Sequence, residues 1–503
     1  MKIMKMKMVL QVSLDNDLSI KFKGRLCLCG YKMVYLNNYK ETFAPTISRD
    51  SVFLTLQIIF IKDMKISLID VKGAFLECQN SYDIYAEIPK DILPEGHPRL
   101  VVKVVNTLYG EKQAAYEWNQ RLCYILCNLM GLEQLIYDKC IFVKRIENDF
   151  ILILAVHVDD ILIGGINDNV INLFKDEFKK HVTEIKEYPE VKKYLGFEIY
   201  HQEDGKIIMN QSNYIEKMLQ DINYQKEEKR KRKYDAPINS TFNFDESDDG
   251  ELFDLLPILG KLRYLADGTK FEILPLMSKL SSKGQKANNS YKDALNLLIE
   301  YVNKHKDEGI CISNCNPNDK SKVVKFFAMC DSSHFNSVDG CDRIGAVFYL
   351  GPNLGSFAAF SHKSKVYSSS PMQSEIIAID KTIRSVVIYR NILRELGFPQ
   401  NEPTKIYTDS LSGIAFFNNL NPDKKMRHIS RIVTGIRHFI NKRIIELVYI
   451  ERKHNVADMM TGIRDGEPFQ LFRHYLLNGY TEEQLENFQK EHEKKLFRKH
   501  SRK

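Results

Sequence analysis

The sequence predicts a multidomain protein of mixed α+β and α/β class. Up to about residue 225, strand-like apolar stretches alternate with segments of helical periodicity. Residues 254–306 repeat their apolar side chains with a helical period, and residues 322–461 begin with strands and continue as alternating helix and strand. A chain of 503 residues suggests two to four domains, which agrees with this change of pattern along the chain.

The elements of the first region follow from apolar spacing. Residues 148–164 predict two short buried strands joined by a tight polar turn. Ala114, Trp118, Leu122 and Leu126 recur every four residues, which predicts a helix within residues 111–131. Further on, a strand, a turn at Asp204-Gly205, a second strand and the start of a helix follow one another.

The second region reads as three strands followed by a helix and then by alternating elements. The expected strands have the sequences KVVKFFAMC, IGAVFYL and SFAAFSH, with a helix near 373–397, a strand at 404–408, a further helix and a strand at 444–450. The last forty residues are charged and predict helices with a basic tail.

Composition excludes some classes of protein. The chain is 44% hydrophobic and 27% charged, which is ordinary for a globular protein, and its net charge of +7 is compatible with a polyanionic partner. No apolar run approaches the ~20 residues that cross a membrane, so we expect no membrane association. Without an export signal, the ten cysteines are expected to be reduced thiols.

Two adjacent acidic residues mark a candidate metal site. Asp159 and Asp160 follow an apolar strand at a tight turn, where their mutual repulsion is unfavourable unless a divalent cation neutralises it. An ordinary hairpin turn is the alternative, because Asp is common there. Asp70 ends another apolar strand, KISLID. If the two strands are neighbours, Asp70 and Asp159 would share two metal ions, the arrangement used for in-line nucleotidyl transfer.

A series of motifs then makes the prediction of function specific. They occur in the order FKGRL (22–26), YKETFAP (39–45), LIDVKGAFL (68–76), LYGEKQAAYEW (108–118), HVDDILIGG (157–165), YLGFEI (194–199), GKIIMNQSNYIEKML (205–219), PILGKLRYL (257–265) and NVADMMTG (455–462). In this order and spacing the chain resembles the reverse transcriptase and RNase H region of copia-type LTR-retrotransposon Pol polyproteins. The resemblance covers most of the chain. It implies a right-hand polymerase with fingers, palm and thumb, followed by an RNase H-like α/β domain.

The resemblance implies roles for individual residues of the polymerase. Asp70, Asp159 and Asp160 would be its catalytic metal ligands, for two Mg²⁺ or Mn²⁺ ions. Phe75 would lie under the incoming sugar and exclude a 2′-hydroxyl. The other expected nucleotide-binding residues are Lys23, Arg25, Tyr109, Gly110, Lys112 and Gln113.

A second set of carboxylates matches the RNase H pattern, in which residues from two strands and two helices surround two metal ions. Asp331 ends the strand KFFAMCD, Glu375 starts the long helix, Asp409 ends the strand KIYTD, and Asp458 starts the last helix of the domain. Each is expected to be catalytic and to bind Mg²⁺ or Mn²⁺. For Asp331 and Asp458, the capping of a strand or helix is the alternative.

The sequence also departs from the family pattern. His157 replaces the usual aromatic residue before the Asp pair, Glu111 and Ala115 replace Leu and Pro, and Gln373 and Ser374 replace Glu and Ala. Glu111 is expected to bring negative charge near the template path. The chain is also expected to be truncated within the fingers. Two hypotheses follow: an active reverse transcriptase with RNase H, or a decayed or co-opted copy that only binds nucleic acid.

The resemblance completes the predicted organisation. We expect reverse transcriptase fingers and palm at 1–225, a mainly helical thumb or connection at 226–321, an RNase H-like domain at 322–465 and a charged helical tail at 466–503. The implied partners are an RNA template, a DNA primer, an RNA–DNA hybrid and dNTPs, with the capsid and integrase of the same element. The implied location is a cytoplasmic virus-like particle, and later the nucleus. The basic run 226–233 is either a nuclear localisation or nucleic-acid contact segment, or a solvated helix.

Overall fold

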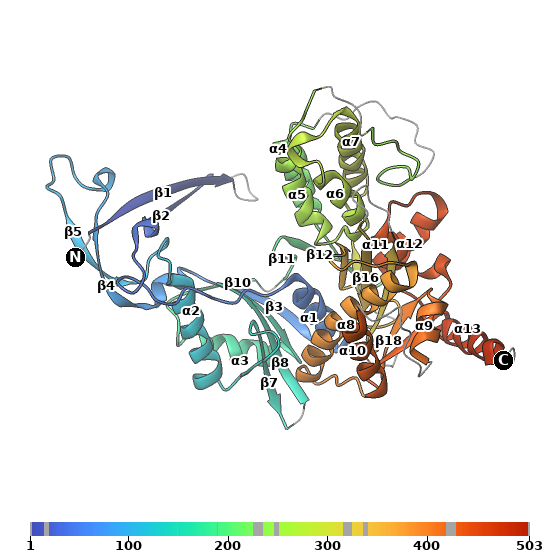
Figure 1. Cartoon of the computed structure of the whole chain (residues 1–503). Helices are drawn as coiled ribbons and strands as arrows, with labels where there is room; N and C mark the ends of the chain where they lie inside the picture. The colour runs from blue at the N-terminus through green and yellow to red at the C-terminus, as the bar shows by residue number, and fades with distance from the viewer. Residues whose placement is uncertain are drawn as a thin grey trace. The chain divides into compact units, whose positions relative to one another are not determined.

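A computed structural model gives the structure of the chain (Figure 1). It divides into two compact units: the first comprises Met1–Ser48 and Asp63–Val191, and the second comprises Arg49–Lys62 and Lys192–Lys503. The structure describes residues 3–14, 20–147, 149–188, 190–224, 235–245, 251–314, 324–334, 341–418 and 429–500. The basic run 226–233 therefore lies outside the described residues, as does part of the acidic stretch that follows it.

The first unit is built on a six-stranded sheet in the order β10-β3-β9-β8-β7-β6. Its strands are β3 (Lys65–Val71), β6 (Glu133–Gln134), β7 (Ile141–Ile146), β8 (Asp149–His157), β9 (Asp160–Gly165) and β10 (Ile185–Tyr188). Neighbouring strands are all antiparallel. The predicted strand–turn–strand at 148–164 is confirmed as β8 and β9, which pair from Leu152↔Gly165 to His157↔Asp160.

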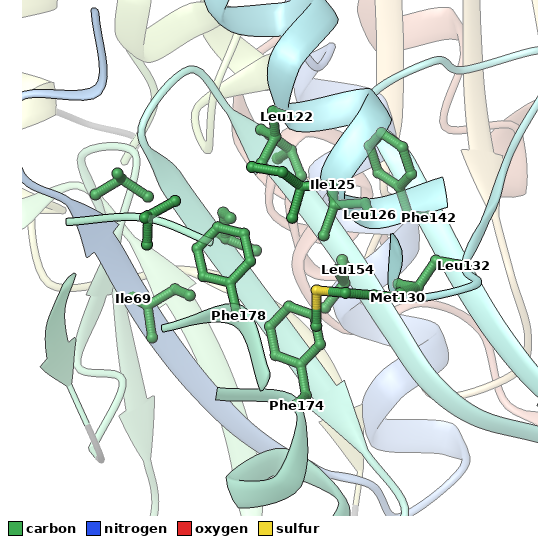
Figure 2. Packing of buried hydrophobic residues seen from close by; sticks show 14 of the residues in the cluster. Ile69, Leu122, Ile125, Leu126, Met130, Leu132, Phe142, Leu154, Phe174 and Phe178 are labelled. Atoms are coloured by element: carbon green, nitrogen blue, oxygen red, sulfur yellow. The ribbon is translucent and has the colours of Figure 1, made fainter. Parts of the chain in front are cut away.

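Helices bury one face of this sheet. The predicted four-residue repeat forms α2 (Ala114–Cys123) and a π-helical turn, η4 (Tyr124–Leu129), and its four apolar residues are at most 2% exposed. Helix α3 (Asp168–Phe178) adds Phe174 and Phe178, whose rings stack at 5.7 Å. Figure 2 shows these side chains meeting Ile69 of β3 and Leu154 of β8 in one cluster. This core fixes the ends of β3, β8 and β9, where the first carboxylates lie.

A second sheet of the first unit has the order β2-β1-β4-β5. Strands β1 (Met4–Leu14) and β2 (Ile20–Leu28) form a long antiparallel hairpin, while β4 (Gln79–Glu87) and β5 (Val101–Asn106) complete the sheet. Side chains alternate across a strand, so Lys23 and Arg25 share one face of the hairpin and Phe22 lies on the other. This hairpin carries the two basic residues that were expected to contact nucleotide.

The second unit contains a five-stranded mixed sheet in the order β17-β16-β15-β18-β19. Its strands are β15 (Phe327–Ser333), β16 (Arg343–Tyr349), β17 (Ala358–Lys363), β18 (Thr404–Thr408) and β19 (Ile445–Tyr449). The first three are antiparallel, whereas β15, β18 and β19 run parallel. The predicted order of three strands followed by alternating helix and strand is thus confirmed, with α8 (Pro371–Glu395) as the long helix.

Shorter helices α9 (Leu411–Asn418), α10 (Ser430–Asn441) and α11 (Asp458–Thr461) follow β18 and β19. The expected helical end of the chain consists of α12 (Gly466–Asn478) and α13 (Glu482–His500).

The rest of the second unit is a small sheet and a group of helices. The sheet has the order β11-β12-β13-β14, with β11 (Lys193–Tyr194), β12 (Phe197–His201), β13 (Lys206–Asn210) and β14 (Ile310–Asn314). The predicted turn between β12 and β13 is confirmed, because Gly205 has φ +83°. The helices are α4 (Ser212–Asp221), α5 (Leu256–Ala266), α6 (Leu274–Ser281) and α7 (Asn289–Lys304).

One helix belongs to a different unit from its sequence neighbours. Helix α1 (Arg49–Ile61) packs against β14, and Phe53 meets Phe197 of β12 at 5.2 Å. Gln57 donates a hydrogen bond of 2.9 Å to the carbonyl oxygen of Gly355. The helix is buried along nine consecutive residues, which suits a helix that is apolar on all sides.

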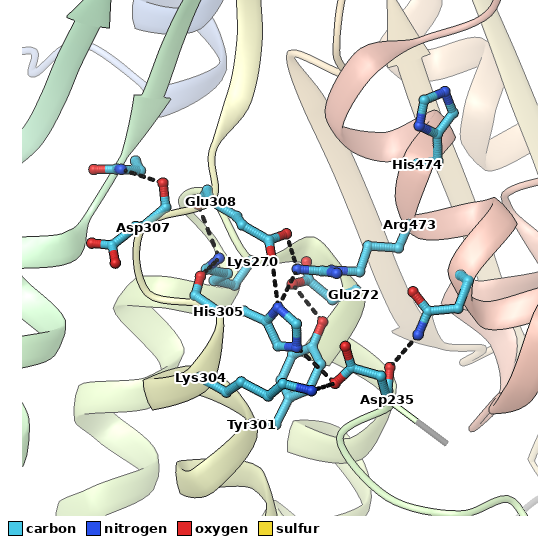
Figure 3. Close-up of polar contacts among 12 residues, drawn as sticks. Asp235, Lys270, Glu272, Tyr301, Lys304, His305, Asp307, Glu308, Arg473 and His474 are labelled. Carbon is cyan, nitrogen blue, oxygen red and sulfur yellow. Dashed lines mark hydrogen bonds and ion pairs between the residues drawn. The ribbon is translucent and has the colours of Figure 1, made fainter. Parts of the chain in front are cut away.

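A buried polar cluster connects α7 to α12 (Figure 3). The fully buried Lys270 donates to the carbonyl oxygens of His305, at 2.6 Å, and Glu308, at 3.0 Å. Arg473 of α12 hydrogen-bonds the ring of His305 at 2.8 Å and forms an ion pair with Glu308. Burial lowers the pKa of Lys270. A buried ammonium group is tolerated here because carbonyl oxygens accept its hydrogen bonds.

The fold class is confirmed as a multidomain α+β and α/β structure. Within the described part of the chain, no helix has both the length and the apolar character needed to cross a membrane.

Candidate active sites

The first candidate site lies at the ends of β3 and β9. Asp70, next to the end of β3, pairs directly with Asp160, the first residue of β9, and the backbone N–H of Val71 donates to the carbonyl oxygen of Asp159 at 2.9 Å. The three carboxylates expected from the sequence are therefore brought to one edge of the sheet. Burial and the negative charges of Asp159 and Asp70 raise the pKa of Asp160 to about 6. Burial, followed by the charge of Asp159, also raises the pKa of Asp70.

The turn that carries the Asp pair is strained. Only Val158 and Asp159 separate β8 from β9, and Val158 has φ +58° although its side chain is β-branched. This conformation costs roughly 1–3 kcal/mol and persists only where surrounding contacts hold it. The buried Trp118 supplies one such contact, because its indole N–H donates to the carbonyl oxygen of Val158 at 2.6 Å. His157 is the last residue of β8 and pairs with Asp160.

Three of the expected nucleotide-binding residues, Phe75, Tyr109 and Arg25, contact one another in the first unit. The rings of Phe75 and Tyr109 meet edge to face at 5.4 Å, and the guanidinium group of Arg25 lies 5.5 Å from the centre of the Tyr109 ring. The positive charge of Lys23 lowers the pKa of Asp70, which opposes the larger effect of burial. These contacts join two aromatic rings and a cationic group, and Lys23 acts separately on the carboxylate of Asp70.

Gly110 is required by the backbone around Tyr109. Its φ is +90°, and a Cβ atom would lie 2.2 Å from the carbonyl oxygen of Leu28. The close approach lets the N–H of Leu28 donate to the carbonyl oxygen of Tyr109 at 2.7 Å. The backbone at Gly110 thus lies directly against Leu28 of β2, which connects the loop to the hairpin.

Lys112 and Gln113 are engaged within the protein. Lys112 Nζ donates to the hydroxyl of Tyr39 at 3.2 Å and lies 4.7 Å from the centre of its ring. Gln113 is 1% exposed and donates to Glu111 Oε2 at 2.6 Å.

Glu111 itself differs from the expectation of a charge beside the template path. Only 6% of its surface is exposed, and its carboxylate accepts hydrogen bonds from the backbone N–H of Leu108 at 3.0 Å and from Asn80 at 2.9 Å. Burial raises the pKa of Glu111 to about 7. The side chain therefore closes the loop that carries Tyr109, and an acid is used there because three N–H groups point at it.

The second candidate site lies in the second unit at the ends of β15 and β18. Asp331, Glu375 and Asp409 each offer a carboxylate oxygen, and these oxygens lie within 4.8 Å of one another. Among the described residues, this is the only group of three or more acidic, His or Cys side chains that converges so closely. The three residues of the first site are adjacent through strand pairing but do not meet this criterion. We refer to Asp331, Glu375 and Asp409 as the triad.

Mutual repulsion within the triad is strong. Burial, followed by the charges of Asp409 and Asp458, raises the pKa of Asp331 to about 8. Burial and the charge of Asp331 also raise the pKa of Glu375 well above its usual range. Thr461 offsets part of this effect, since its hydroxyl donates to Asp331 Oδ2 at 2.6 Å.

The helix that carries Glu375 begins with a well-formed cap. The side chain of Ser370 accepts a hydrogen bond from the backbone N–H of Gln373, and Gln373 Oε1 accepts one from the N–H of Ser369 at 2.8 Å. This reciprocal arrangement resembles a capping box, in which Gln and Glu are both effective. The departure at Gln373 therefore supports the start of α8 and keeps Glu375 in place.

Asp458 is near the triad but is held by two arginines. Arg464 contacts both of its oxygens, with an Nη2–Oδ1 distance of 3.0 Å. Arg452 donates to Oδ1 through Nε at 3.0 Å, and its Nη2 forms an ion pair with Oδ1 at 2.9 Å. The preceding loop is fixed by the buried Asn455, which donates to the carbonyl oxygen of Cys330 at 3.0 Å. Sequence reasoning found Asp458 but missed both arginines, which lie six residues before and after it.

The triad has the chemistry of a divalent-cation site. All of its donor atoms are carboxylate oxygens, which Mg²⁺ and Mn²⁺ prefer. Glu375 Oε2 is buried and has no hydrogen-bond partner among the residues that the structure describes. A bound cation would satisfy this oxygen and neutralise the charges that raise the pKa values.

Comparisons with known proteins agree with this picture. Residues 1–232 match the family described as "Reverse transcriptase (RNA-dependent DNA polymerase)". A retrovirus-related Pol polyprotein from transposon TNT 1-94 of Nicotiana tabacum is 24% identical over 480 residues, covering 93% of this chain and 35% of the relative. The Pol polyprotein from transposon RE1 of Arabidopsis thaliana is 25% identical over 462 residues, covering 91% and 30%. The chain thus spans about a third of the length of these relatives.

A solved foamy viral protease-reverse transcriptase in complex with dsDNA is 14% identical to the chain, with a TM-score of 0.46, and covers 88% of this chain and 79% of that one.

The match to reverse transcriptases thus covers residues 1–232, which include the three carboxylates of the first site. Over most of its length, the chain is similar to these retrotransposon Pol polyproteins.

Proposed function

We propose that the chain is an RNA-directed DNA polymerase with ribonuclease H activity. The observation that carries this proposal is that the family motifs assemble two separate carboxylate clusters, one in each compact unit. Asp70, Asp159 and Asp160 are proposed to act in nucleotidyl transfer. The triad and Asp458 are proposed to act in the hydrolysis of RNA.

The proposed cofactor is Mg²⁺ or Mn²⁺, with two ions at each site. Bound there, the cations would activate the attacking hydroxyl or water and stabilise the charge that develops on the phosphate. In the polymerase site, the paired strands β3 and β9 hold Asp70 against Asp160, and Trp118 fixes the turn between β8 and β9. These contacts keep the carboxylates in place before nucleotide arrives, which is the contribution that positioning makes to catalysis.

Binding of substrate is assigned to the residues around Tyr109. Phe75, packed edge to face on Tyr109, is proposed to lie under the sugar and to exclude a 2′-hydroxyl. Lys23 and Arg25 are proposed to contact the triphosphate, and Arg25 can do so with two N–H groups. For Gly110, Lys112 and Gln113 we propose a supporting role, because their backbone or side chains are engaged within the first unit.

The proposed substrates are an RNA template, a DNA primer, dNTPs and the resulting RNA–DNA hybrid. We propose the same domain organisation that the sequence predicts: fingers and palm at 1–225, thumb or connection at 226–321, RNase H at 322–465 and a tail at 466–503. We further propose that the chain works in a cytoplasmic particle with the capsid and integrase of its element.

One observation favours the alternative of a copy that binds nucleic acid without catalysis. Arg452 and Arg464 donate hydrogen bonds to the carboxylate of Asp458, which leaves three carboxylates rather than four open to a cation. In contrast, Gln373 caps a helix and Glu111 is buried, so neither departure weakens the case for activity.

The test of the polymerase is extension of a DNA primer on an RNA template with Mg²⁺ or Mn²⁺. We expect the wild-type chain and an Asp176→Asn control, which alters an exposed carboxylate of α3, to extend the primer. Asp159→Asn should lose extension by at least 100-fold. Phe75→Ala should admit ribonucleotides. Equal extension by wild type and Asp159→Asn would contradict the proposal.

A further inference from the structure

The hydrogen bonds of Asp458 leave it little capacity for another ligand. Its Oδ1 accepts from Arg452 Nε and Arg464 Nη2, each at 3.0 Å, and its Oδ2 accepts from Arg464 Nε; Arg452 Nη2 also lies 2.9 Å from Oδ1 as an ion pair. A carboxylate offers about four lone-pair positions, two on each oxygen. Oδ1 is therefore saturated, and a cation at this oxygen must displace a guanidinium group.

Asp458 nevertheless lies beside the triad. The negative charge of Asp458 acts on both Asp331 and Asp409, and the positive charge of Arg452 acts on the same two residues. Thr461, at the end of the short helix that begins with Asp458, donates to Asp331 and to the carbonyl oxygen of Asp458 itself. The two arginines thus offset part of the carboxylate charge that would otherwise attract a cation.

The two arginines are held to different degrees. The Arg464 side chain is 24% exposed and grips Asp458 with two parallel N–H groups, whereas the Arg452 side chain is 71% exposed and contacts a single oxygen. Exposed ion pairs contribute little stability, while two-pronged contacts with arginine are stronger. Arg452 is therefore the guanidinium group that is released more easily. A free guanidinium beside a site for RNA hydrolysis would meet a phosphate of the nucleic acid.

We propose that Arg452 is a phosphate-binding residue that Asp458 holds in the absence of nucleic acid, and that it transfers to a backbone phosphate of the RNA–DNA hybrid, freeing Asp458 for a divalent cation. This inference rests on the proposed RNase H function of the triad. Arg464 remains on Asp458 as a positioning residue.

Uptake of Mn²⁺ without nucleic acid tests the first half. All proteins carry Asp70→Asn and Asp159→Asn, so that the first site does not contribute, and free Mn²⁺ is followed by electron paramagnetic resonance. Arg452→Gln should tighten Mn²⁺ binding roughly 3- to 10-fold, because Asp458 Oδ1 loses the guanidinium group bound to it and a positive charge near Asp331 and Asp409 is removed. In an Asp458→Asn background only the second effect remains, so the same change should tighten binding by a clearly smaller factor. An unchanged or weakened Kd for Arg452→Gln would overturn the proposal.

Binding of an RNA–DNA hybrid tests the second half. Fluorescence anisotropy is measured in Ca²⁺ over a range of salt, with a gel check that the RNA stays intact. Arg452→Gln should weaken binding and reduce the salt slope by about 1, and Arg452→Lys should restore the slope. The matched control is Arg443→Gln, since Arg443 is 79% exposed and pairs with Glu402. A salt slope equal to that of wild type would overturn the transfer.

Neither measurement requires catalysis. A chain that fails to hydrolyse RNA would refute the proposed function, while the coupling of Arg452 with Asp458 would still be decided by Mn²⁺ uptake. A purely structural ion pair would lower thermal stability in Arg452→Gln without changing the Mn²⁺ Kd or the salt slope, and that result would also overturn the proposal.

Discussion

Replacement of Asp331 by Asn should stabilise the protein in the absence of metal. The pKa of Asp331 is raised from 3.8 to about 8, mainly by burial and then by the charges of Asp409 and Asp458. Keeping the proton on this group at pH 7, where the unfolded chain has released it, therefore costs the folded state up to roughly 4 kcal/mol, taking ~1.4 kcal/mol for each pH unit above the usual pKa. The neighbours share the repulsion, so we expect Asp331→Asn to recover about 2–4 kcal/mol.

The sign of the pH dependence follows from the same shift. Between pH 4 and 8, the folded protein holds a proton on Asp331 that the unfolded chain has released. Raising the pH across this interval therefore favours unfolding, because the unfolded state binds fewer protons. Wild type in EDTA should lose stability from pH 5 to pH 8, and Asp331→Asn should lose much less. Addition of Mg²⁺ should stabilise wild type but not the variant.

Thermal unfolding in EDTA, followed by circular dichroism at pH 5 and pH 8, measures both effects. The control is Asp293→Asn, an exposed carboxylate on α7, which should behave as wild type. If Asp331→Asn proved less stable than wild type at pH 8, or if the pH dependence of the two were the same, the assignment of repulsion within the triad would be wrong.

Three further changes test the supporting structure. Gly110→Ala places a Cβ 2.2 Å from the carbonyl oxygen of Leu28 and should destabilise the first unit by about 2–4 kcal/mol in urea unfolding; a loss below 1 kcal/mol would contradict this. Glu111→Gln points an amide N–H toward N–H groups that now donate hydrogen bonds to Glu111, and should lower the stability of the first unit by about 1–3 kcal/mol. Unchanged stability together with higher polymerase activity would instead support Glu111 as a negative charge near the template path. Lys270→Met leaves two buried carbonyl oxygens without their donor and should cost the second unit about 2–4 kcal/mol, measured by the same method; a stabilised variant would show that burial of the charge outweighs its hydrogen bonds.

The elements that the sequence predicts best are those with strong local patterns. The repeat from Ala114 to Leu126 has the spacing of one helix face, and all four residues are buried in the core. The apolar run before Asp159 predicts a buried strand, which places the Asp pair at its end, and β8 confirms this strand. Asp331 and Asp409 were found for the same reason, since Asp331 comes directly after the apolar residues of β15 and Asp409 directly follows β18.

What the sequence could not show depends on contacts between distant residues. In the sequence, helix α1 stands between two segments of the first unit, but it packs in the second unit. No local pattern distinguishes these two outcomes. Glu111 was expected to bring charge near the template, and its burial was missed. Its partner Asn80 lies thirty-one residues away, so the hydrogen bond between them could not be inferred from spacing. The arginines on Asp458 were missed because the chain must fold back on both sides of a short helix to bring them together.

The central claim is that each carboxylate cluster performs one reaction, and a single crossed assay tests it. A DNA primer and an RNA template carry different labels, so that primer extension and RNA hydrolysis are read in the same tube with Mg²⁺. We predict that wild type shows both activities, that Asp159→Asn loses only extension, and that Asp409→Asn loses only hydrolysis. Loss of both activities in each variant, or retention of both, would contradict the assignment of two independent sites.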